Sequence, residues 1–534
     1  MMLVLAAFVG LLLALLAPRH AASEPLARRI ERWEAPLRHS GPWVVAVISM
    51  LVVWFTWDAL SPIPKVHDES SYLLQADIFA QLRWTAPSPP IADFFEQPHV
   101  LVAPAVASKY PPGHALLLTL GSLAGFPALI PLLLTGVTAA LIFALATRLT
   151  NPWTALLAWL IWLTAPLVLR FQPSYFSQLT TTALVLASWW LLLDWRETRR
   201  RRWLLLLALA IGWGAITRPL TMLVFAIPLG VVVVRDVVRL GHWRDFALAC
   251  AVGVAVLSIL PLWNARTTGD WRVSPIERYR LDYLPFDKIG FTPDTSAPRR
   301  AASPLLKALY SEYLGLRKRQ RLVALPLIIA DRTVQVAIAL FQGARLPLLL
   351  FAIAGLFLAS TAVRFGVASA LLLFLAHLPY AHGATWTVYY LEAVPVVAAV
   401  AAIGVWGVAR RLAASEPGAR AALVLASIAI AAFAVPDVAR WRLDHRMRSA
   451  FHRQFSEQLR RLPSRHAIVF VRYSPRLAPH GAVVTNYANL AAAPVWVVHD
   501  LGPRNEELRR LAPDRASFDF DEDRMVGGRL ERDR

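Results

Sequence analysis

The sequence is dominated by repeated apolar runs, many of them long enough to cross a lipid bilayer as helices. A hydrocarbon core of about 30 Å needs roughly 20 residues per helix, because each residue rises by about 1.5 Å. Of the 534 residues, 57% are hydrophobic and only 17% are charged, which excludes a water-soluble enzyme of ordinary composition. The runs predict twelve membrane spans, near 2–17, 42–60, 128–148, 152–169, 176–195, 203–217, 220–234, 245–262, 345–361, 366–380, 388–408 and 420–436.

The charges of the connecting loops predict an orientation for these spans. Basic loops stay on the cytoplasmic side of a membrane, and arginines concentrate in the loops 18–41, 196–202, 235–244 and 410–420. These loops alternate with the others if the twelve spans are correct. The net charge of +20 therefore largely reflects membrane orientation and is not a nucleic-acid signature. With a single cysteine, Cys250, the chain has no internal disulfide framework and no cysteine-based metal site.

Two apolar segments do not fit the pattern of spans. Segment 113–126 is too short for a confident span, and counting it would raise the number to thirteen and invert everything after it. Segment 322–341 has Asp331 and Arg332 at its middle, where intramembrane charge is costly, so we expect an interfacial helix.

The predicted fold class is an all-α polytopic membrane protein of about 12–13 transmembrane helices with a small C-terminal soluble α/β domain. We expect residues 1–41 to form an N-terminal anchor helix and a cytoplasmic basic linker. The run 2–17 lacks the basic start of a secretory signal, which favours an uncleaved anchor over a removed signal peptide. Residues 42–437 form the transmembrane domain, with outer loops 61–112 and 263–344.

The C-terminal residues 438–534 are rich in Arg, Asp and Glu with short apolar strips, which indicates a soluble domain on the outer, periplasmic side. The pattern predicts a helix at 441–461, strands at Ala467–Val471 and Val495–Val498, and a helix at Arg504–Leu511.

Ionisable residues gather in the first outer loop, directly after the span 42–60. The stretch His67-Asp68-Glu69 places two carboxylates and an imidazole at a membrane surface, where desolvation and a bound lipid can tune a general base. Acidic residues at a helix N-terminus also favour the macrodipole and can cap it. The residues alone leave both roles open.

The same loop ends in Lys109-Tyr110-Pro111-Pro112-Gly113, just before an apolar run. The proline pair breaks regular structure and places Lys109 at headgroup level, where a lipid phosphate lies. A snorkelling lysine at a membrane border is the alternative.

The order of Asp68-Glu69, then Lys109-Tyr110-Pro111-Pro112, then many spans resembles the GT-C glycosyltransferase superfamily. More closely, it resembles the bacterial family 39-like branch related to protein O-mannosyltransferases and lipid A aminoarabinose transferases. The resemblance covers roughly 42–410. Thr217-Arg218-Pro219 and Tyr389-Tyr390-Leu391-Glu392 extend it, whereas Gln178 stands where relatives commonly carry Asp or His.

The resemblance implies a membrane enzyme that moves a sugar from a polyprenyl-phosphate donor to a hydroxyl of a lipid, glycan or protein on the outer face. In that family the paired acidic motif lies in the active site, so Asp68 is our first choice for the catalytic base and Glu69 the second. Lys109 and Arg218 are the expected phosphate ligands, although pairing with a carboxylate is an equal alternative for Arg218. The further substrate-binding candidates are Tyr110, Gln178, Tyr389, Tyr390, Glu392 and His67.

No cofactor and no metal site is predicted. The outer-face histidines His67, His99, His377 and His382 have no diagnostic ligand spacing, although a divalent metal stays conceivable. The expected partners are the lipid-linked donor, membrane lipids and an unknown hydroxyl acceptor, without nucleic acid, at the inner (plasma) membrane. The alternative functions are a transporter or flippase for a lipid-linked sugar, or a non-catalytic membrane scaffold; a transporter would favour polar groups at the bilayer midplane and internal symmetry.

Overall fold

The computed structural model describes residues 9–10, 12, 24–58, 62–292, 296–300, 303–413, 415–474, 479–522 and 531–532. The predicted first span, 2–17, lies outside these residues except at positions 9, 10 and 12, so its role as an anchor stays a prediction.

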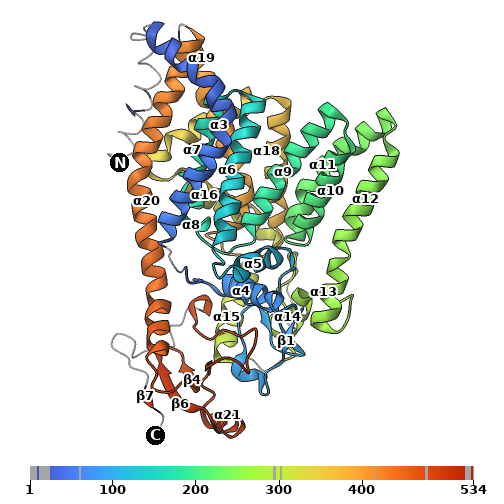
Figure 1. The fold of residues 1–534 in the computed structure, drawn as a ribbon, viewed down its shortest axis with the longest axis vertical. Coiled ribbons are helices and arrows are strands. Elements are labelled where there is room, and N and C mark those ends of the chain that lie inside the picture. Colours follow the sequence, from blue (N-terminus) through green and yellow to red (C-terminus); the bar gives the residue numbers. More distant parts are fainter. Residues whose placement is uncertain are drawn as a thin grey trace.

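A bundle of apolar helices forms the upper part of the molecule in Figure 1. Among the described residues, seven helical segments are long and apolar enough to cross a membrane, and four shorter apolar helices accompany them. The chain is therefore a multi-pass membrane protein. The bundle contains α3 (Glu24–Trp57), α6 (Leu129–Leu149), α7 (Pro152–Leu163), α8 (Pro166–Phe171), α9 (Gln178–Thr198), α10 (Arg201–Ala215), α11 (Pro219–Leu240), α12 (Trp243–Leu257), α13 (Ile259–Thr268), α16 (Leu325–Phe341), α17 (Pro347–Leu358), α18 (Thr361–His377), α19 (Val394–Leu412) and the membrane half of α20 (Glu416–Arg460).

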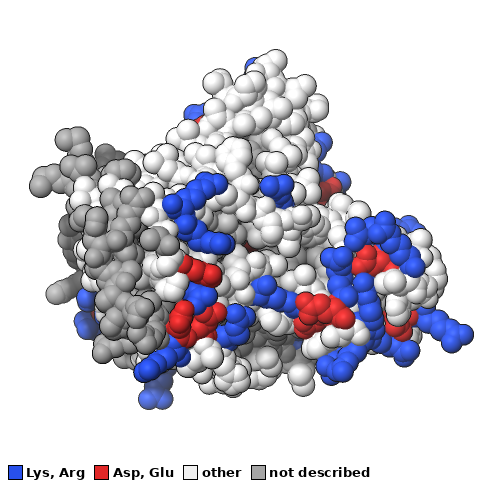
Figure 2. Space-filling view, turned by 90° about the horizontal axis from the view of Figure 1, so that it is seen from above, with Lys and Arg blue, Asp and Glu red and all other residues white. Residues whose placement is uncertain are grey.

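The loops predicted to be cytoplasmic meet at one end of this bundle. The turns between α9 and α10, α11 and α12, and α19 and α20 all lie at the upper end in Figure 1. Figure 2 looks onto that end and shows several patches of lysine and arginine side chains, with acidic side chains among them. Part of this positive charge is paired with acidic side chains of neighbouring helices, since Nε of Arg196 in α9 lies 2.9 Å from a carboxylate oxygen of Asp236 in α11. The grouping agrees with the orientation that the loop charges predict.

The two doubtful apolar segments take different places in the structure. Residues 113–126 contain only the short helix α5 (Gly113–Leu123), which lies below the bundle in Figure 1. In α16 the guanidinium of Arg332 donates to the carbonyl oxygens of His377 (2.6 Å) and Tyr380 (2.7 Å), at the outer end of α18. These bonds satisfy the guanidinium of Arg332 inside an apolar helix. Residues 322–341 are nevertheless one of the seven segments long and apolar enough to cross a membrane, so the interfacial placement stays a prediction.

Helices α17 and α19 approach each other closely through two glycines. A β-carbon on Gly404 would lie 1.8 Å from the carbonyl oxygen of Phe351, and one on Gly355 would lie 1.9 Å from that of Val400. Only glycine leaves room for backbones this close, as small residues commonly do between membrane helices. The pair fixes α19, whose outer end carries Tyr389, Tyr390 and Glu392 on the 3₁₀ turn η4 (Thr387–Ala393).

Two long segments between the membrane helices cover the outer end of the bundle. The first contains α4 (His67–Ala80), β1 (Ala86–Pro87), η1 (Ala92–Phe95), β2 (Val100–Leu101), β3 (Ala105–Ser108) and α5, and the second contains α14 (Pro275–Tyr283), α15 (Pro304–Arg319) and η2 (Leu322–Ala324). The three strands form an antiparallel sheet in the order β1-β3-β2. This pairing brings the backbone N–H of Lys109 within 3.0 Å of the carbonyl of His99.

The C-terminal region forms the predicted α/β unit at the bottom of Figure 1. Strand β4 (Ala467–Arg472) runs parallel to β5 (Val495–His499) and to β6 (Ala516–Asp521), and β7 (Glu531–Arg532) adds an antiparallel edge. Helix α21 (Asn505–Leu511) lies between β5 and β6 in the chain. Both predicted strands and both predicted helices are present in the structure.

The predicted separation between the last span and the C-terminal helix is wrong, because α20 is continuous from Glu416 to Arg460. The apolar run 420–436 and the charged helix 441–461 are two halves of this 45-residue element, with Pro436 inside it. The change from apolar to charged residues marks where the helix leaves the apolar layer and does not mark a break in the backbone.

The α17–α19 contact predicts a specific loss of stability. Gly404→Val should lower the free energy of unfolding by roughly 1–3 kcal/mol, because the added atoms force two backbones apart. Gly253→Val in α12 is the matched control, since nothing lies within 4 Å of the β-carbon position there. Thermal unfolding in detergent measures both, and equal midpoints for the two variants would contradict the close contact.

Candidate active site

Asp68 lies in the first turn of α4, at the outer end of the bundle. Its Oδ1 accepts a 2.5 Å hydrogen bond from the hydroxyl of Tyr110. Its Oδ2 lies 3.4 Å from Nε2 of His99 and 3.9 Å from Nδ1 of His480. Burial alone would raise the pKa of Asp68, but these imidazoles and the Tyr110 hydrogen bond outweigh burial and hold that pKa below its usual range. Asp68 is therefore ionised at neutral pH, and its side chain is still 26% exposed.

Glu69 faces a different environment although it is the next residue. Its Oε1 accepts the backbone N–H of Lys65 at 3.2 Å, and its Oε2 accepts that of Tyr175 at 3.0 Å. The side chain is 1% exposed. Glu69 thus satisfies backbone donors at the start of α4 and in the turn before α9, which is the helix-end role left open by the sequence. Asp68 makes no such bond within the described chain.

The imidazoles of His99 and His480 lie beside the carboxylate of Asp68. One ligand atom each from Asp68, His99 and His480 lie within 4.8 Å of one another. Both ring nitrogens of His67 are buried without a hydrogen-bond partner among the described residues, whereas Nε2 of the buried His99 lies 3.4 Å from Oδ2 of Asp68. Burial, together with the charge of Lys109, lowers the pKa of His99 to about 4, so this ring is neutral at pH 7.

Lys109 follows β3 and is 9% exposed. Its Nζ lies 4.8 Å from the ring centroid of Tyr279 and 5.3 Å from that of Tyr110. Burial lowers the pKa of Lys109, while the carboxylates of Asp287 and Asp68 oppose this shift. None of the ion pairs found between described residues involves Lys109, so its charge faces aromatic rings and two more distant carboxylates.

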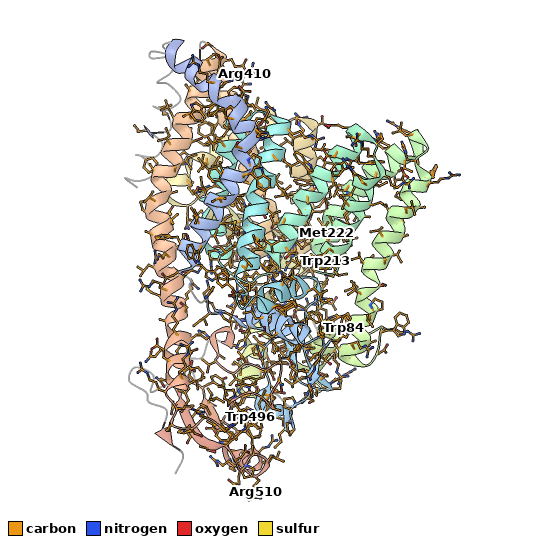
Figure 3. All side chains as sticks on the ribbon, in the orientation of Figure 1. Trp84, Trp213, Met222, Arg410, Trp496 and Arg510 are labelled. Atoms are coloured by element: carbon orange, nitrogen blue, oxygen red, sulfur yellow. The ribbon has the colours of Figure 1, made fainter. Side chains whose placement is uncertain are left out.

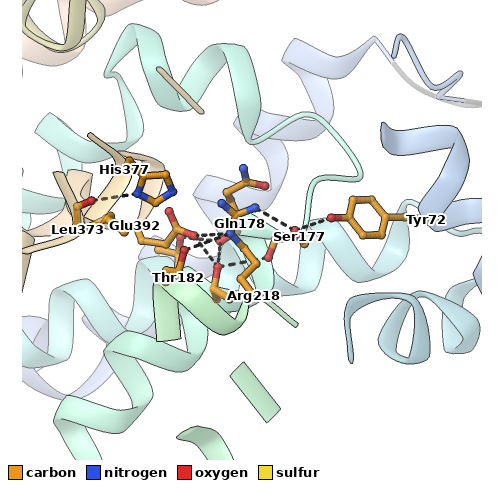
Figure 4. Close-up of polar contacts among 10 residues, drawn as sticks. Tyr72, Ser177, Gln178, Thr182, Arg218, Leu373, His377 and Glu392 are labelled. Atoms are coloured by element: carbon orange, nitrogen blue, oxygen red, sulfur yellow. Dashed lines mark hydrogen bonds and ion pairs between the residues drawn. The ribbon is translucent and has the colours of Figure 1, made fainter. Parts of the chain in front are cut away.

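Arg218 immediately precedes α11 and forms an ion pair across the bundle. Its Nε lies 3.3 Å from Oε1 of Glu392, which also accepts a 2.7 Å hydrogen bond from the hydroxyl of Thr181. Figure 4 shows the two side chains meeting between η4 and the start of α9. The Glu392 side chain is fully buried, whereas that of Arg218 is 16% exposed. Arg218 is therefore paired with a carboxylate in the structure, which was one of the two roles that the sequence left open for it.

A run of contacts joins this ion pair to Asp68. Nη1 of Arg218 lies 3.5 Å from the hydroxyl of Ser177, which shares a 2.9 Å hydrogen bond with Tyr72 (Figure 4). The ring of Tyr72 stacks on that of Tyr110 with centroids 4.8 Å apart. Because Tyr110 binds Asp68, the two charged groups belong to one connected site.

The remaining predicted substrate-binding residues differ in their surroundings. Gln178 lies beside Ser177 in Figure 4, and its buried side-chain oxygen has no hydrogen-bond partner among the described residues. Tyr390 is buried, and its hydroxyl lies 3.3 Å from Nε2 of His382. Tyr389 is less buried, packs 4.7 Å from the ring of His382, and lies within electrostatic range of Asp68.

The C-terminal unit reaches this site by docking on the first outer loop. Phe94 and Phe95 belong to the same buried cluster as Phe470, Trp496 and other residues of the C-terminal sheet. Hydrogen bonds flank this cluster, because the backbone N–H of Asn486 donates to Gln97 Oε1 at 2.7 Å and His499 Nε2 lies 2.6 Å from the carbonyl of Glu96. Figure 3 shows Trp496 at this lower end of the molecule.

Sequence reasoning missed His480 completely. This residue lies on the 3₁₀ turn η5 (Pro479–Gly481) of the C-terminal unit, 412 positions after Asp68, and no local motif marks it. Of the four outer-face histidines singled out from the sequence, His377 and His382 instead contact backbone carbonyls, at 3.0 and 2.9 Å. Asp287 was also missed, since its electrostatic partner Lys109 lies far away in the chain.

Part of the chain matches a known protein family. Residues 109–264 match the family described as dolichyl-phosphate-mannose-protein mannosyltransferase, and this segment includes Lys109, Gln178 and Arg218. The match confirms, over this segment, the resemblance to the GT-C glycosyltransferase superfamily. No curated protein matches the chain.

Two solved structures of ArnT from Cupriavidus metallidurans are similar to the chain. The structure bound to undecaprenyl phosphate has 15% sequence identity and a TM-score of 0.49, and the apo structure has 14% identity and a TM-score of 0.47. Each alignment covers 91% of this chain and 94% of the ArnT chain.

The contrast between the two adjacent carboxylates predicts that only one supports the fold. Glu69→Ala should lower the free energy of unfolding by roughly 1–3 kcal/mol for each buried backbone N–H that loses its acceptor. Glu312→Ala, at an exposed position of α15, is the matched control and should change it by less than about 0.5 kcal/mol. Thermal unfolding in detergent compares them, and an unchanged midpoint for Glu69→Ala would refute the supporting role.

Proposed function

We propose that the chain is an integral membrane glycosyltransferase that moves a sugar from a polyprenyl-phosphate donor to a hydroxyl acceptor. The observation that carries this proposal is the placement, in one site at the outer end of the bundle, of the partly exposed carboxylate of Asp68 and of a buried Lys109 that forms no ion pair among the described residues. The match of residues 109–264 to a family named for a dolichyl-phosphate sugar supports the donor class.

Asp68 is suited to accept the proton of the acceptor hydroxyl. In a direct displacement, the acceptor oxygen forms a bond to the anomeric carbon while the bond from that carbon to the phosphate oxygen breaks. The proton passes to a carboxylate oxygen of Asp68, and Tyr110 holds the carboxylate in place through its 2.5 Å hydrogen bond. Glu69 is not available for this step, because both of its oxygens bind backbone N–H groups.

Lys109 is suited to bind the departing phosphate. The phosphate gains negative charge as its bond to the sugar breaks, and a cation in a poorly hydrated site stabilises that charge more than one in water. Burial disfavours the charged form of Lys109, so an anion that enters the site recovers an interaction that the apo site lacks. Arg218 supplies a second cation on the same connected site, held in position by Glu392.

The active site in this proposal faces the periplasm or the cell exterior, and the protein lies in the inner (plasma) membrane. The basic loops gather at the opposite end of the bundle, as the view in Figure 2 shows, and basic loops remain cytoplasmic. Lipid-linked donors and acceptors of the outer leaflet would then reach Asp68 and Lys109 without crossing the bilayer.

Removal of the proposed base gives the first test. Asp68→Asn should reduce sugar transfer by roughly 100- to 10,000-fold, because a positioned base contributes about that factor. The assay supplies polyprenyl phosphates carrying radiolabelled mannose, glucose or aminoarabinose, with a cell-envelope lipid extract as acceptor, and measures labelled product in detergent. Asp77→Asn, an exposed carboxylate on the same helix, is the matched control and should keep full activity.

The outcomes of this assay separate the proposal from its alternatives. A flippase moves the lipid-linked sugar without breaking the bond to phosphate, so wild-type protein that releases no sugar from any donor would favour a transporter or a scaffold. An Asp68→Asn variant with wild-type turnover would remove Asp68 as the base.

The proposed phosphate ligand gives the second test. Lys109→Gln should weaken the binding of undecaprenyl phosphate roughly 10- to 100-fold, because a hydrogen bond to a charged group contributes about 1.5–3 kcal/mol. Lys307→Gln, at an exposed position of α15, is the control with an identical change of side chain. Quenching of the intrinsic tryptophan fluorescence by the lipid measures binding, and equal affinities for both variants would exclude Lys109 as the ligand.

A further inference from the structure

A large apolar cavity lies between six helices of the bundle, apart from the proposed active site. Its walls come from α6, α7, α9, α11, α18 and α19, and its volume is about 570 Å³. Packed protein interiors have few spaces larger than a water molecule, and a cavity of this size lies within the range of ligand sites. Its walls are mostly aliphatic and aromatic, so they suit a hydrocarbon chain better than water.

The cavity occupies the half of the bundle that faces the cytoplasm in the orientation proposed above. Along α9 its lining extends from Leu186 to Arg196, and a helical segment of this length spans about 15 Å. The apolar core of a bilayer is about 30 Å thick, so this depth matches one leaflet. Thr181, which contacts Glu392 in the outer site, does not line the cavity. The cavity therefore has the depth of an acyl chain of the inner leaflet.

The charged residues that line the cavity are two arginines, within the described chain. Arg196 lies near the end of α9 and Arg235 near the end of α11, and their side chains are 41% and 47% exposed. Together with Arg199 they share the single carboxylate of Asp236, at distances from 2.9 to 3.4 Å. One carboxylate does not neutralise three guanidinium groups, so positive charge stays available to an anion at this rim.

The other acidic residues at this end of α9 do not cancel that charge at the cavity. Asp194 and Glu197 both pair with Arg148, at 2.8 and 2.6 Å. None of these three residues lines the cavity. The cavity therefore combines an apolar body with a basic rim, and this combination is complementary to a lipid with an anionic headgroup.

Two polar atoms of the lining residues are buried without a hydrogen-bond partner among the described residues. They are Oγ1 of Thr154, near the start of α7, and Nε1 of Trp189 in α9. Both groups can donate a hydrogen bond, and buried donors nearly always have an acceptor. The ester carbonyl oxygens that join the headgroup of a phospholipid to its chains are acceptors of this kind.

We propose that this cavity binds an anionic phospholipid of the inner leaflet, of the phosphatidylglycerol type. One acyl chain fills the apolar body, the phosphate lies against Arg196 and Arg235, and an ester carbonyl accepts a hydrogen bond from Thr154 or Trp189. Basic pockets between membrane helices on the cytoplasmic side bind anionic headgroups in this way. The site rests on the proposed orientation and does not depend on sugar transfer.

Titration with phosphatidylglycerol tests the site. The full-length protein is purified in detergent and stripped of lipid, and native mass spectrometry then counts the phosphatidylglycerol molecules bound. Arg196→Gln combined with Arg235→Gln should weaken the first binding event roughly 10- to 100-fold, because charged donors to the phosphate are lost. Arg199→Gln combined with Arg201→Gln is the matched control. It removes equal charge from the same end, and Arg199 also pairs with Asp236, but neither side chain lines the cavity.

A further variant distinguishes an inner-leaflet lipid from the tail of the polyprenyl donor. Ala399→Phe fills part of the cavity without a change of charge. It should weaken the binding of phosphatidylglycerol and leave that of undecaprenyl phosphate unchanged. The reverse result, or equal phosphatidylglycerol affinities for the two double variants, would overturn the proposal.

A measurement on the wild-type protein needs no variant to fold. Phosphatidylglycerol should raise its thermal midpoint more than phosphatidylcholine with the same chains, because a ligand that binds the folded state stabilises it. Phosphatidylcholine presents the same esters and phosphate without net negative charge. Equal shifts from the two lipids would show that the arginines do not select an anionic headgroup and would overturn the site.

Discussion

The insertion of Phe94 and Phe95 into the hydrophobic core of the C-terminal sheet is the contact on which the arrangement of the outer face depends. Both rings are at most 1% exposed, and full burial of one such ring contributes roughly 1.5–3 kcal/mol. The two rings fix the segment that continues through Glu96 and Gln97 to His99. The same contact brings the turn that carries His480 over the start of α4. The outer loop and the C-terminal unit therefore share one core, and each positions residues of the other.

Buried charge is handled in three different ways around the pocket. Glu69 accepts hydrogen bonds from backbone N–H groups, and Glu392 forms an ion pair with Arg218 and accepts a hydrogen bond from the hydroxyl of Thr181. Among the described residues Lys109 has neither kind of partner, and its ammonium group faces aromatic rings. An isolated buried charge is costly, so a fold that retains one gains most when an oppositely charged ligand arrives. The first two groups hold the pocket in shape, and Lys109 keeps its charge available.

Local pattern predicted much of this structure, because apolar run length and loop charge act on short stretches of chain. The helices of the bundle and the strands Ala467–Val471 and Val495–Val498 follow from such patterns. The different fates of Asp68 and Glu69 could not be predicted, because they depend on which neighbour meets the backbone N–H of Tyr175. The contact between His480 and Asp68 could not be predicted either, because it results from docking between segments that are distant in the sequence. The change in composition near residue 437 also suggested a break between two helices that does not exist, because an apolar stretch and a charged stretch can belong to one helix.

The continuous helix α20 sets both the distance of the C-terminal unit from the bundle and the direction in which that unit faces. A helix of 45 residues is roughly 68 Å long, more than twice the bilayer core of about 30 Å, so its lower half extends rigidly beyond the membrane. Each residue advances a helix by about 100° of azimuth. The number of residues between the bundle and β4 therefore sets the direction in which the C-terminal unit faces. Inserting one residue between the two halves of α20 would turn that unit by more than a quarter of a circle, although every contact within each half could remain. The length of α20 therefore determines whether the C-terminal unit faces the first outer loop, as the pocket around Asp68 requires.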